Sequence, residues 1–422
     1  MSSNKNIVKY SLNLFFLLML VLPASFQAPR GLFLGLILLF SLRTDLLHKL
    51  IFDRTTVYLA IINVGTSIFF IVYGLILSAP GALNVSTVYV VWPILYFYFI
   101  GFNSKTSDIL PFMSMILYGC IISAILVLLF IINTFIGIPG VSVIASAQDF
   151  TVGFYDGFIE LNSMNLATIM YAFSFSLTIV LLPKDLNYFA AGKMKTINFI
   201  SVVVSLLLIL ISARRAFWLV CLLSPIIIIA LFKLSGIRIN LRKYLLPFFG
   251  VLLFSGIAFS LLSLDLTIIT TEFDTIFEFD NPDAESNYLR KEQYDALVNG
   301  WMDSPFFGKG LGATAKGSIR DEAAPWAYEL SYMALLFQTG IIGMCIYGGS
   351  ILWIYFKSIR IMRSQGALAV FMLAPQIIGL TCFLIVNASN PYLAKFDYLW
   401  TVFLPIATIN AFSLNRGKTD VQ

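Results

Sequence analysis

"NFISVVVSLLLILISARRAFWLVCLLSPIIIIALF", residues 198–232, places two arginines between two long apolar segments. No charged residue occurs from Ile197 to Ser212, and none occurs from Ala216 to Phe232. Apolar segments of this kind are typical of transmembrane helices, which need about 20 such residues to cross a bilayer. Because an arginine inside the hydrocarbon layer is costly, intramembrane arginines tend to serve a function. Arg214 and Arg215 are therefore candidates for a functional site at a helix end.

The composition of the whole chain is that of a membrane protein. Of its 422 residues, 59% are hydrophobic and 12% are charged, and the mean hydropathy is +0.89. A soluble globular domain would carry about a quarter of its residues as charged side chains. The apolar segments are long and continuous, whereas a transmembrane β-barrel shows short alternating ones. The sequence therefore predicts an all-α polytopic membrane protein.

Apolar segments long enough to cross a membrane recur along the chain, and they predict about 12 transmembrane helices. They lie near 10–27, 31–42, 56–78, 86–102, 109–136, 162–183, 197–213, 216–232, 244–264, 327–356, 367–387 and 397–414. The second segment is short, because Arg43 ends it. It spans the bilayer only if it begins before Arg30, and we then expect the Arg30 side chain to reach outward toward water.

The distribution of lysine and arginine predicts the orientation. If the N-terminus is cytoplasmic and the helices alternate, two thirds of the 27 Lys and Arg residues lie on the inner side, as the positive-inside rule requires. Both termini are then cytoplasmic. We predict three parts: transmembrane helices 1–9 in residues 1–264, a large periplasmic or extracellular loop in 265–326, and transmembrane helices 10–12 with a cytoplasmic tail in 327–422.

Part of the large loop is predicted to be helical. "NPDAESNYLRKEQYDALVNGWMDSP", residues 281–305, begins with an Asn-Pro pair typical of a helix start. Helical spacing places one set of residues on an apolar face: Leu289, Ala296, Leu297, Gly300 and Trp301. Arg290 projects on or near the same face. The glycines of "GKGLG", residues 308–312, lack the pattern of a phosphate-binding loop and predict a tight turn.

The order of these motifs resembles the O-antigen ligase/polymerase family, which includes Wzy-like polysaccharide polymerases and the related ligases. The resemblance covers roughly residues 197–345. It rests on Arg-Arg-Ala at an outer helix end, then an outer loop with Arg, Trp and P-x-x-G-x-G-x-G. The segment "YELSYMALLFQTGIIG", residues 328–343, then opens the next helix. The resemblance implies a GT-C-like fold whose outer loop contains short helices.

The resemblance also implies a function. Members are bacterial inner-membrane glycosyltransferases of O-antigen and lipopolysaccharide biosynthesis that use a glycan on undecaprenyl diphosphate and work without metal or other cofactor. We expect a polysaccharide polymerase whose donor and acceptor are both lipid-linked. The bilayer, a chain-length regulator and a flippase are the implied partners, and nucleic acid is not.

Site residues follow from the same resemblance. Arg215 matches the family's arginine before a small residue, and Arg290 matches its outer-loop arginine. At the start of the next helix, where the family often has histidine, this chain has Glu329. His48, the only histidine, lies on the predicted cytoplasmic side, so Glu329 is the expected general base. Five further residues are expected to bind the substrate: Arg214, Tyr294, Trp301, Tyr328 and Tyr332.

Several alternatives are open at this point. The arginine pair could be interfacial residues at a helix turn, and Arg290 could pair with a nearby acid among Asp283, Glu285 and Glu292. Glu329 could cap the helix, and Trp301 could belong to the core of the loop. Glutamate in place of histidine favours a polymerase over an O-antigen ligase that uses lipid A core as acceptor. A flippase or transporter would show internal repeats, and none is visible.

Overall fold

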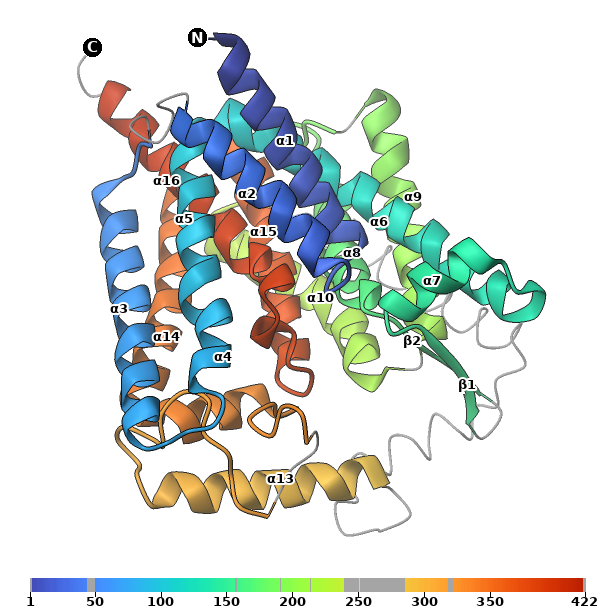
Figure 1. Ribbon diagram of the computed structural model, residues 1–422. Coiled ribbons are helices and arrows are strands. Elements are labelled where there is room, and N and C mark those ends of the chain that lie inside the picture. The colour runs from blue at the N-terminus through green and yellow to red at the C-terminus, as the bar shows by residue number, and fades with distance from the viewer. Residues whose placement is uncertain are drawn as a thin grey trace.

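The protein is a bundle of long helices (Figure 1). This computed structural model describes residues 2–43, 50–155, 158–189, 191–212, 214–238, 250, 285–317 and 322–419. The start of helix α1 (Ser2–Val21) and the end of helix α16 (Trp400–Thr419) lie at one end of the bundle. Helix α13 (Glu285–Met302) lies across the opposite end, which we name the α13 end.

The described helices coincide with the predicted apolar segments. They are α1, α2 (Gln27–Arg43), α3 (Arg54–Ile76), the continuous α4–η2–α5 stretch (Ala82–Ser86, Thr87–Val91, Trp92–Phe102), α6 (Thr106–Ile136), α8 (Asn165–Leu181), α9 (Gly192–Ile211), α10 (Arg215–Leu234), α14 (Ser331–Ser364), α15 (Gly366–Asn387) and α16. The predicted ninth segment, 244–264, lies outside the described residues except for position 250. Seven of the described helices are long and apolar enough to cross a membrane. The polytopic helical fold is therefore confirmed, and the number of twelve spans stays a prediction.

One part of the chain departs from the all-α expectation. Strands β1 (Thr151–Tyr155) and β2 (Phe158–Asn162) form an antiparallel hairpin in which Thr151 pairs with Asn162. It follows the short helix α7 (Pro139–Ala147), which was also not predicted. Gly137, at φ 72°, ends α6, and Pro139 begins α7. Glycine after a helix end and proline at a helix start are both common.

The centre of the bundle is formed by α8, whose residues are almost all buried, and α15, most of whose residues are buried. Polar side chains join these helices to their neighbours. The Thr408 hydroxyl donates to Gln376 Oε1 at 3.0 Å, and Ser176 and Ser201 share a hydrogen bond of 3.0 Å. Hydrogen bonds between helices hold a bundle together where the hydrophobic effect cannot, because lipid is as apolar as the helix surface. The bond between Thr408 and Gln376 joins α16 to α15, the two helices on either side of the next connection.

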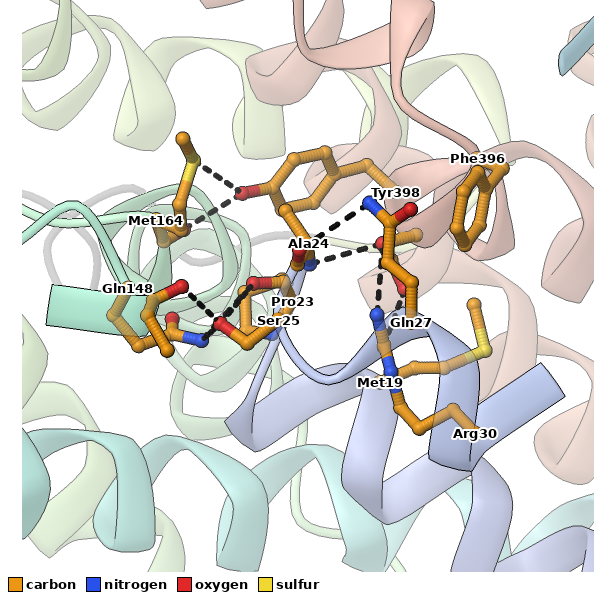
Figure 2. Close-up of polar contacts among 12 residues, drawn as sticks. Met19, Pro23, Ala24, Ser25, Gln27, Arg30, Gln148, Met164, Phe396 and Tyr398 are labelled. Atoms are coloured by element: carbon orange, nitrogen blue, oxygen red, sulfur yellow. Dashed lines mark hydrogen bonds and ion pairs between the residues drawn. The ribbon is translucent and has the colours of Figure 1, made fainter. Parts of the chain in front are cut away.

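That connection contains a buried ion pair. Arg30, in α2, is 6% exposed, and Asp397, in the short 3-10 helix η4 (Phe396–Tyr398), is fully buried. The guanidinium binds both carboxylate oxygens, at 2.5 and 3.2 Å, and the Ala24 amide donates to Asp397 at 2.9 Å (Figure 2). Burial raises the pKa of Asp397, and Arg30 opposes that shift. The expectation that Arg30 reaches outward to water is therefore wrong, because its partner lies 367 residues away in the sequence.

Further hydrogen bonds join the segments around this ion pair. Gln148 Nε2 donates to the Pro23 carbonyl at 3.0 Å, and the Tyr398 hydroxyl donates to the Met164 carbonyl at 2.8 Å (Figure 2). The α1–α2 turn, the residues beside the hairpin and the α15–α16 connection thus form one hydrogen-bonded unit.

The fold should tolerate the loss of both charges of this ion pair better than the loss of one. Replacing Asp397 by Leu alone leaves a buried guanidinium without its counter-charge, and we expect the free energy of unfolding to fall by about 3–5 kcal/mol. The double variant Arg30→Met/Asp397→Leu should recover most of that loss. Unfolding of detergent-solubilised protein, followed by intrinsic fluorescence, measures both. A double variant as unstable as the sum of the single variants would contradict the pairing.

Candidate functional site

Helix α13 packs against the start of α14 along a single stripe. Arg290, Gln293, Leu297 and Gly300 recur at spacings of three and four residues, so they share one face. Leu297 is fully buried, and a Cβ on Gly300 would lie 2.5 Å from the ring of Phe337. The expected position of Arg290 on the packing side is therefore confirmed. Leu289 was expected on that face and is 44% exposed, because it lies one residue off the stripe.

The stripe brings Arg290 to Glu329. The Arg290 Nε donates to Glu329 Oε2 at 3.1 Å, and the two side chains are 33% and 20% exposed. One turn along α13, the buried amide of Gln293 accepts a hydrogen bond of 2.9 Å from the backbone of Leu330. The sequence patterns did not single out Gln293. A glutamine among apolar positions of an amphipathic stripe was the available signal.

Glu329 does not lie within helix α14. The helix begins at Ser331, and its N-cap residue is Leu330, without a side-chain cap. The predicted helix began near residue 327, which would place Glu329 two residues inside it, and this expectation is therefore wrong. The described capping geometry does not support the alternative role as a helix cap. The Glu329 carboxylate instead binds an arginine 39 residues earlier in the chain.

Helix α14 is broken at Gly340, where φ is 61° and ψ is −170°. The break separates backbone groups that an unbroken helix would pair, and the loop that follows α13 binds them instead. The Lys309 amide donates to the Phe337 carbonyl at 2.9 Å, and the Ile341 amide donates to the Pro305 carbonyl at 2.9 Å. A broken membrane helix persists only where protein or water satisfies its freed backbone groups. Residues 305–311 do so here.

The glycines of the loop allow its backbone to touch other backbones. At Gly310, φ is +85°, and a Cβ would lie 2.2 Å from the Cα of Gly74 in α3. The Leu311 amide donates to the Phe70 carbonyl at 3.0 Å, and Gly312 touches the start of α4 in the same way. The predicted tight turn is confirmed, and it also joins α3, α4 and α14.

The four aromatic residues that were expected to bind substrate differ in their exposure. The Tyr328 hydroxyl is buried and accepts a hydrogen bond of 2.6 Å from the Ala315 amide. The Trp301 indole donates to the Pro305 carbonyl at 3.1 Å within the same apolar cluster, as the core alternative for Trp301 expects. Tyr294 and Tyr332 are 48% and 36% exposed. Substrate binding by all four stays a prediction, and the exposed pair has the accessible rings.

Arg214 and Arg215 lie at the turn between α9 and α10. Arg214 is the N-cap residue of α10, and Arg215 is its first residue; both are half-buried. Arg214 donates to Asn390 Oδ1 at 3.1 Å, to the Tyr392 hydroxyl at 3.2 Å and to Asn162 Oδ1. All three partners are neutral. They orient the guanidinium without cancelling its charge.

Helix α15 and the turn after it contact Tyr332, which lies near Glu329, and Arg214. The Tyr332 hydroxyl, three residues after Glu329, donates to the Leu384 carbonyl at 2.5 Å. Asn390, which binds Arg214, lies in the turn that follows the end of α15 at Asn387. Neighbouring elements at one end of the bundle thus hold both Tyr332 and Arg214. Among the described residues, no three His, Cys, Asp or Glu side chains form a group that could hold a metal ion.

A comparison with known protein families decides the classification. Residues 200–347 match the family described as O-antigen ligase. The chain carries a domain of the O-antigen ligase family. The resemblance seen in the sequence is thereby confirmed, and the domain contains Arg214, Arg215, Arg290 and Glu329. Together with the apolar helices, the match indicates a multi-pass bacterial membrane protein. No match is found among curated proteins.

The loop contacts of this O-antigen ligase domain can be tested with two glycines of similar φ. Gly310→Ala should prevent correct folding, because the methyl group would overlap the backbone of Gly74. Gly317, at φ +88°, has no atom within 4 Å of the position that a methyl group would take, so Gly317→Ala should cost only about 1–2 kcal/mol of backbone strain. Size-exclusion profiles of the purified variants measure the difference. Equal yields of monodisperse protein would contradict the tight approach.

Proposed function

We propose that this protein is an O-antigen polymerase, a metal-independent glycosyltransferase that joins lipid-linked repeat units at the outer face of the inner membrane. The contact between Arg290 and Glu329 carries the proposal. It places a carboxylate and a guanidinium side by side at the start of α14. Arg214 and Arg215 lie at the same end of the bundle, where α10 begins. A site of this kind can both activate a hydroxyl and bind an anionic leaving group.

The proposed reaction is a single displacement. The acceptor hydroxyl oxygen attacks the anomeric carbon of the donor glycan, and a new glycosidic C–O bond forms. The bond from that carbon to the diphosphate breaks, and its electron pair leaves with the diphosphate oxygen. The hydroxyl proton passes to the Glu329 carboxylate, which acts as general base. The base is restored when that proton is released to water.

The arginines act on the leaving group in this proposal. A guanidinium presents five N–H donors in a planar fork and stays charged, which suits the oxygens of a diphosphate. Arg290 can therefore bind Glu329 and a phosphate oxygen together. Arg215, at the first turn of α10, also has the helix dipole behind it, which favours an anion at that end.

The second candidate function is O-antigen ligase, in which lipid A core is the acceptor. The description of the matched family favours it. Glu329 in place of the family's frequent histidine favours the polymerase. A gel of surface and lipid-linked glycan separates them. Loss of a polymerase collapses the ladder to single repeats, whereas loss of a ligase leaves polymer on the lipid carrier and none on the core.

Substitutions at the proposed base give the sharpest test. Glu329→Gln keeps the shape of the side chain and removes its basicity, so we expect chain growth to stop. Glu329→His should keep part of the activity. Arg290→Lys and Arg215→Lys should lower turnover on the order of 10²-fold, because lysine lacks the fork. The assay is polymer formed by purified protein from lipid-linked repeat units. Glu322→Gln, an exposed acid of the same loop, is the matched control.

Near-normal polymer from Glu329→Gln would remove Glu329 from the mechanism. Wild-type rates from Arg215→Lys and Arg290→Lys would show that charge alone suffices at these positions.

The proposal also requires the α13 end to face the periplasm. Asn299 is an exposed residue of α13. A cysteine placed there in a cysteine-free background should react with a membrane-impermeant maleimide in intact spheroplasts. The control is a cysteine at Lys193, an exposed residue at the start of α9, which should react only after lysis. The reverse pattern would place the site in the cytoplasm and end the proposal.

A further inference from the structure

Lys395 has an unusual environment for a lysine. It lies in the α15–α16 connection, between the short helices η3 (Tyr392–Ala394) and η4, and is half-buried. Its ammonium group is 3.1 Å from the sulfur of Met164. A thioether is a weak acceptor, whereas an ammonium group has three donors to satisfy. The contacts of Lys395 with the described residues therefore leave most of its hydrogen-bonding capacity unused.

The nearby carboxylate does not neutralise Lys395. Asp397, two residues later, is bound by both ends of the Arg30 fork and by the Ala24 amide. Within the part of the chain that the structure describes, no carboxylate lies within 4.0 Å of the Lys395 ammonium. Burial lowers the pKa of Lys395; the charges of Asp149 and Asp397 act against this shift, and that of Arg214 adds to it. The surroundings of Lys395 thus disfavour its charged ammonium form.

Arg214 has the same property. Its partners Asn390, Tyr392 and Asn162 are neutral, and its Nε is buried without a hydrogen bond among the described atoms. The η3 connection supplies two of those partners and also carries Lys395. Arg30, Arg214 and Lys395 carry three positive charges, and the nearby Asp149 and Asp397 carry two negative ones, so one positive charge is left over. Of these cations, Arg214 and Lys395 have no carboxylate within 4.0 Å in the part of the chain that the structure describes. Such an excess favours an anionic ligand.

We propose that Lys395 is a second cation of the diphosphate site, where it binds one phosphate group while Arg214 binds the other. The inference rests on the proposed function, because it assigns a residue to the leaving group of that reaction. The two cations would distinguish a diphosphate from a monophosphate, and so would set which lipid carrier the site accepts. Lys395 would act as a binding residue and take no part in proton transfer.

Direct binding of soluble probes tests this assignment. Farnesyl diphosphate, farnesyl monophosphate and inorganic pyrophosphate are titrated against the purified full-length protein in nanodiscs. The wild-type protein should prefer the isoprenyl diphosphate to the monophosphate. Lys395→Met keeps the length of the side chain and removes the charge. Its affinity for the diphosphate should fall roughly 10- to 100-fold, the size of one charge-assisted hydrogen bond, while its affinity for the monophosphate stays unchanged.

Two variants serve as controls. Lys395→Arg should keep the preference for the diphosphate, and Lys316→Met removes an exposed lysine of the outer loop and should leave all affinities unchanged. Because the pKa of Lys395 is lowered, the affinity of the wild-type protein for the diphosphate should fall as the pH rises through that pKa. The Lys395→Arg protein should show no such fall.

Each outcome has a defined meaning. An unchanged diphosphate affinity in Lys395→Met, or equal losses for both phosphate classes, would overturn the assignment. Inorganic pyrophosphate binding as tightly as farnesyl diphosphate would show an anion site that does not select a lipid, and would overturn the carrier-selection part. A Lys395-dependent diphosphate preference in a protein that forms no polymer would uphold the site and defeat the proposed polymerase. Polymer formation with no role for Lys395 would do the reverse.

Discussion

The broken helix α14 is the constraint on which the rest of the site depends. A gap in a membrane helix exposes backbone N–H and C=O groups, and the bilayer offers no water to bind them. In this protein the loop 305–311 supplies those partners at Gly340. The same loop follows α13 directly, so its insertion also fixes the end of α13. Because α13 is then held in place, Arg290 reaches Glu329 and Gln293 reaches the Leu330 amide.

Two sets of charged residues near the α15–α16 connection differ in their partners. Arg30 and Asp397 neutralise one another in a buried pair, and that pair fastens the α15–α16 connection to α2. Arg214 and Lys395 are instead oriented by amides, a hydroxyl and a thioether, none of which carries charge. Buried charges are costly unless they are paired. Arg30 and Asp397 are paired, whereas the nearby Arg214 and Lys395 have neutral partners. Their positive charge therefore stays available for an anionic ligand.

The sequence was sufficient for the helices, because each needs only a local run of apolar residues. The segments predicted from hydropathy became α1 to α6, α8 to α10 and α14 to α16, apart from the one that lies outside the described residues. Local pattern also placed Arg290 on the packing face of α13. It missed the hairpin of residues 151–162, whose strands are short and mix polar with apolar positions. It set the start of α14 too early, because apolar residues near 327 belong to a loop that packs rather than to the helix.

By itself, the sequence determined that this is a polytopic helical membrane protein and that residues 200–347, which contain Arg214, Arg215, Arg290 and Glu329, resemble the O-antigen ligase family. Composition and the order of motifs contain that information, since neither depends on contacts between distant segments. Only the tertiary structure decided which charges are partners. Arg30 meets Asp397 across 367 residues, and Arg290 meets Glu329 across 39. Such pairs form because the bundle brings helix ends together, and the energy of burying a charge depends on that assembled surrounding.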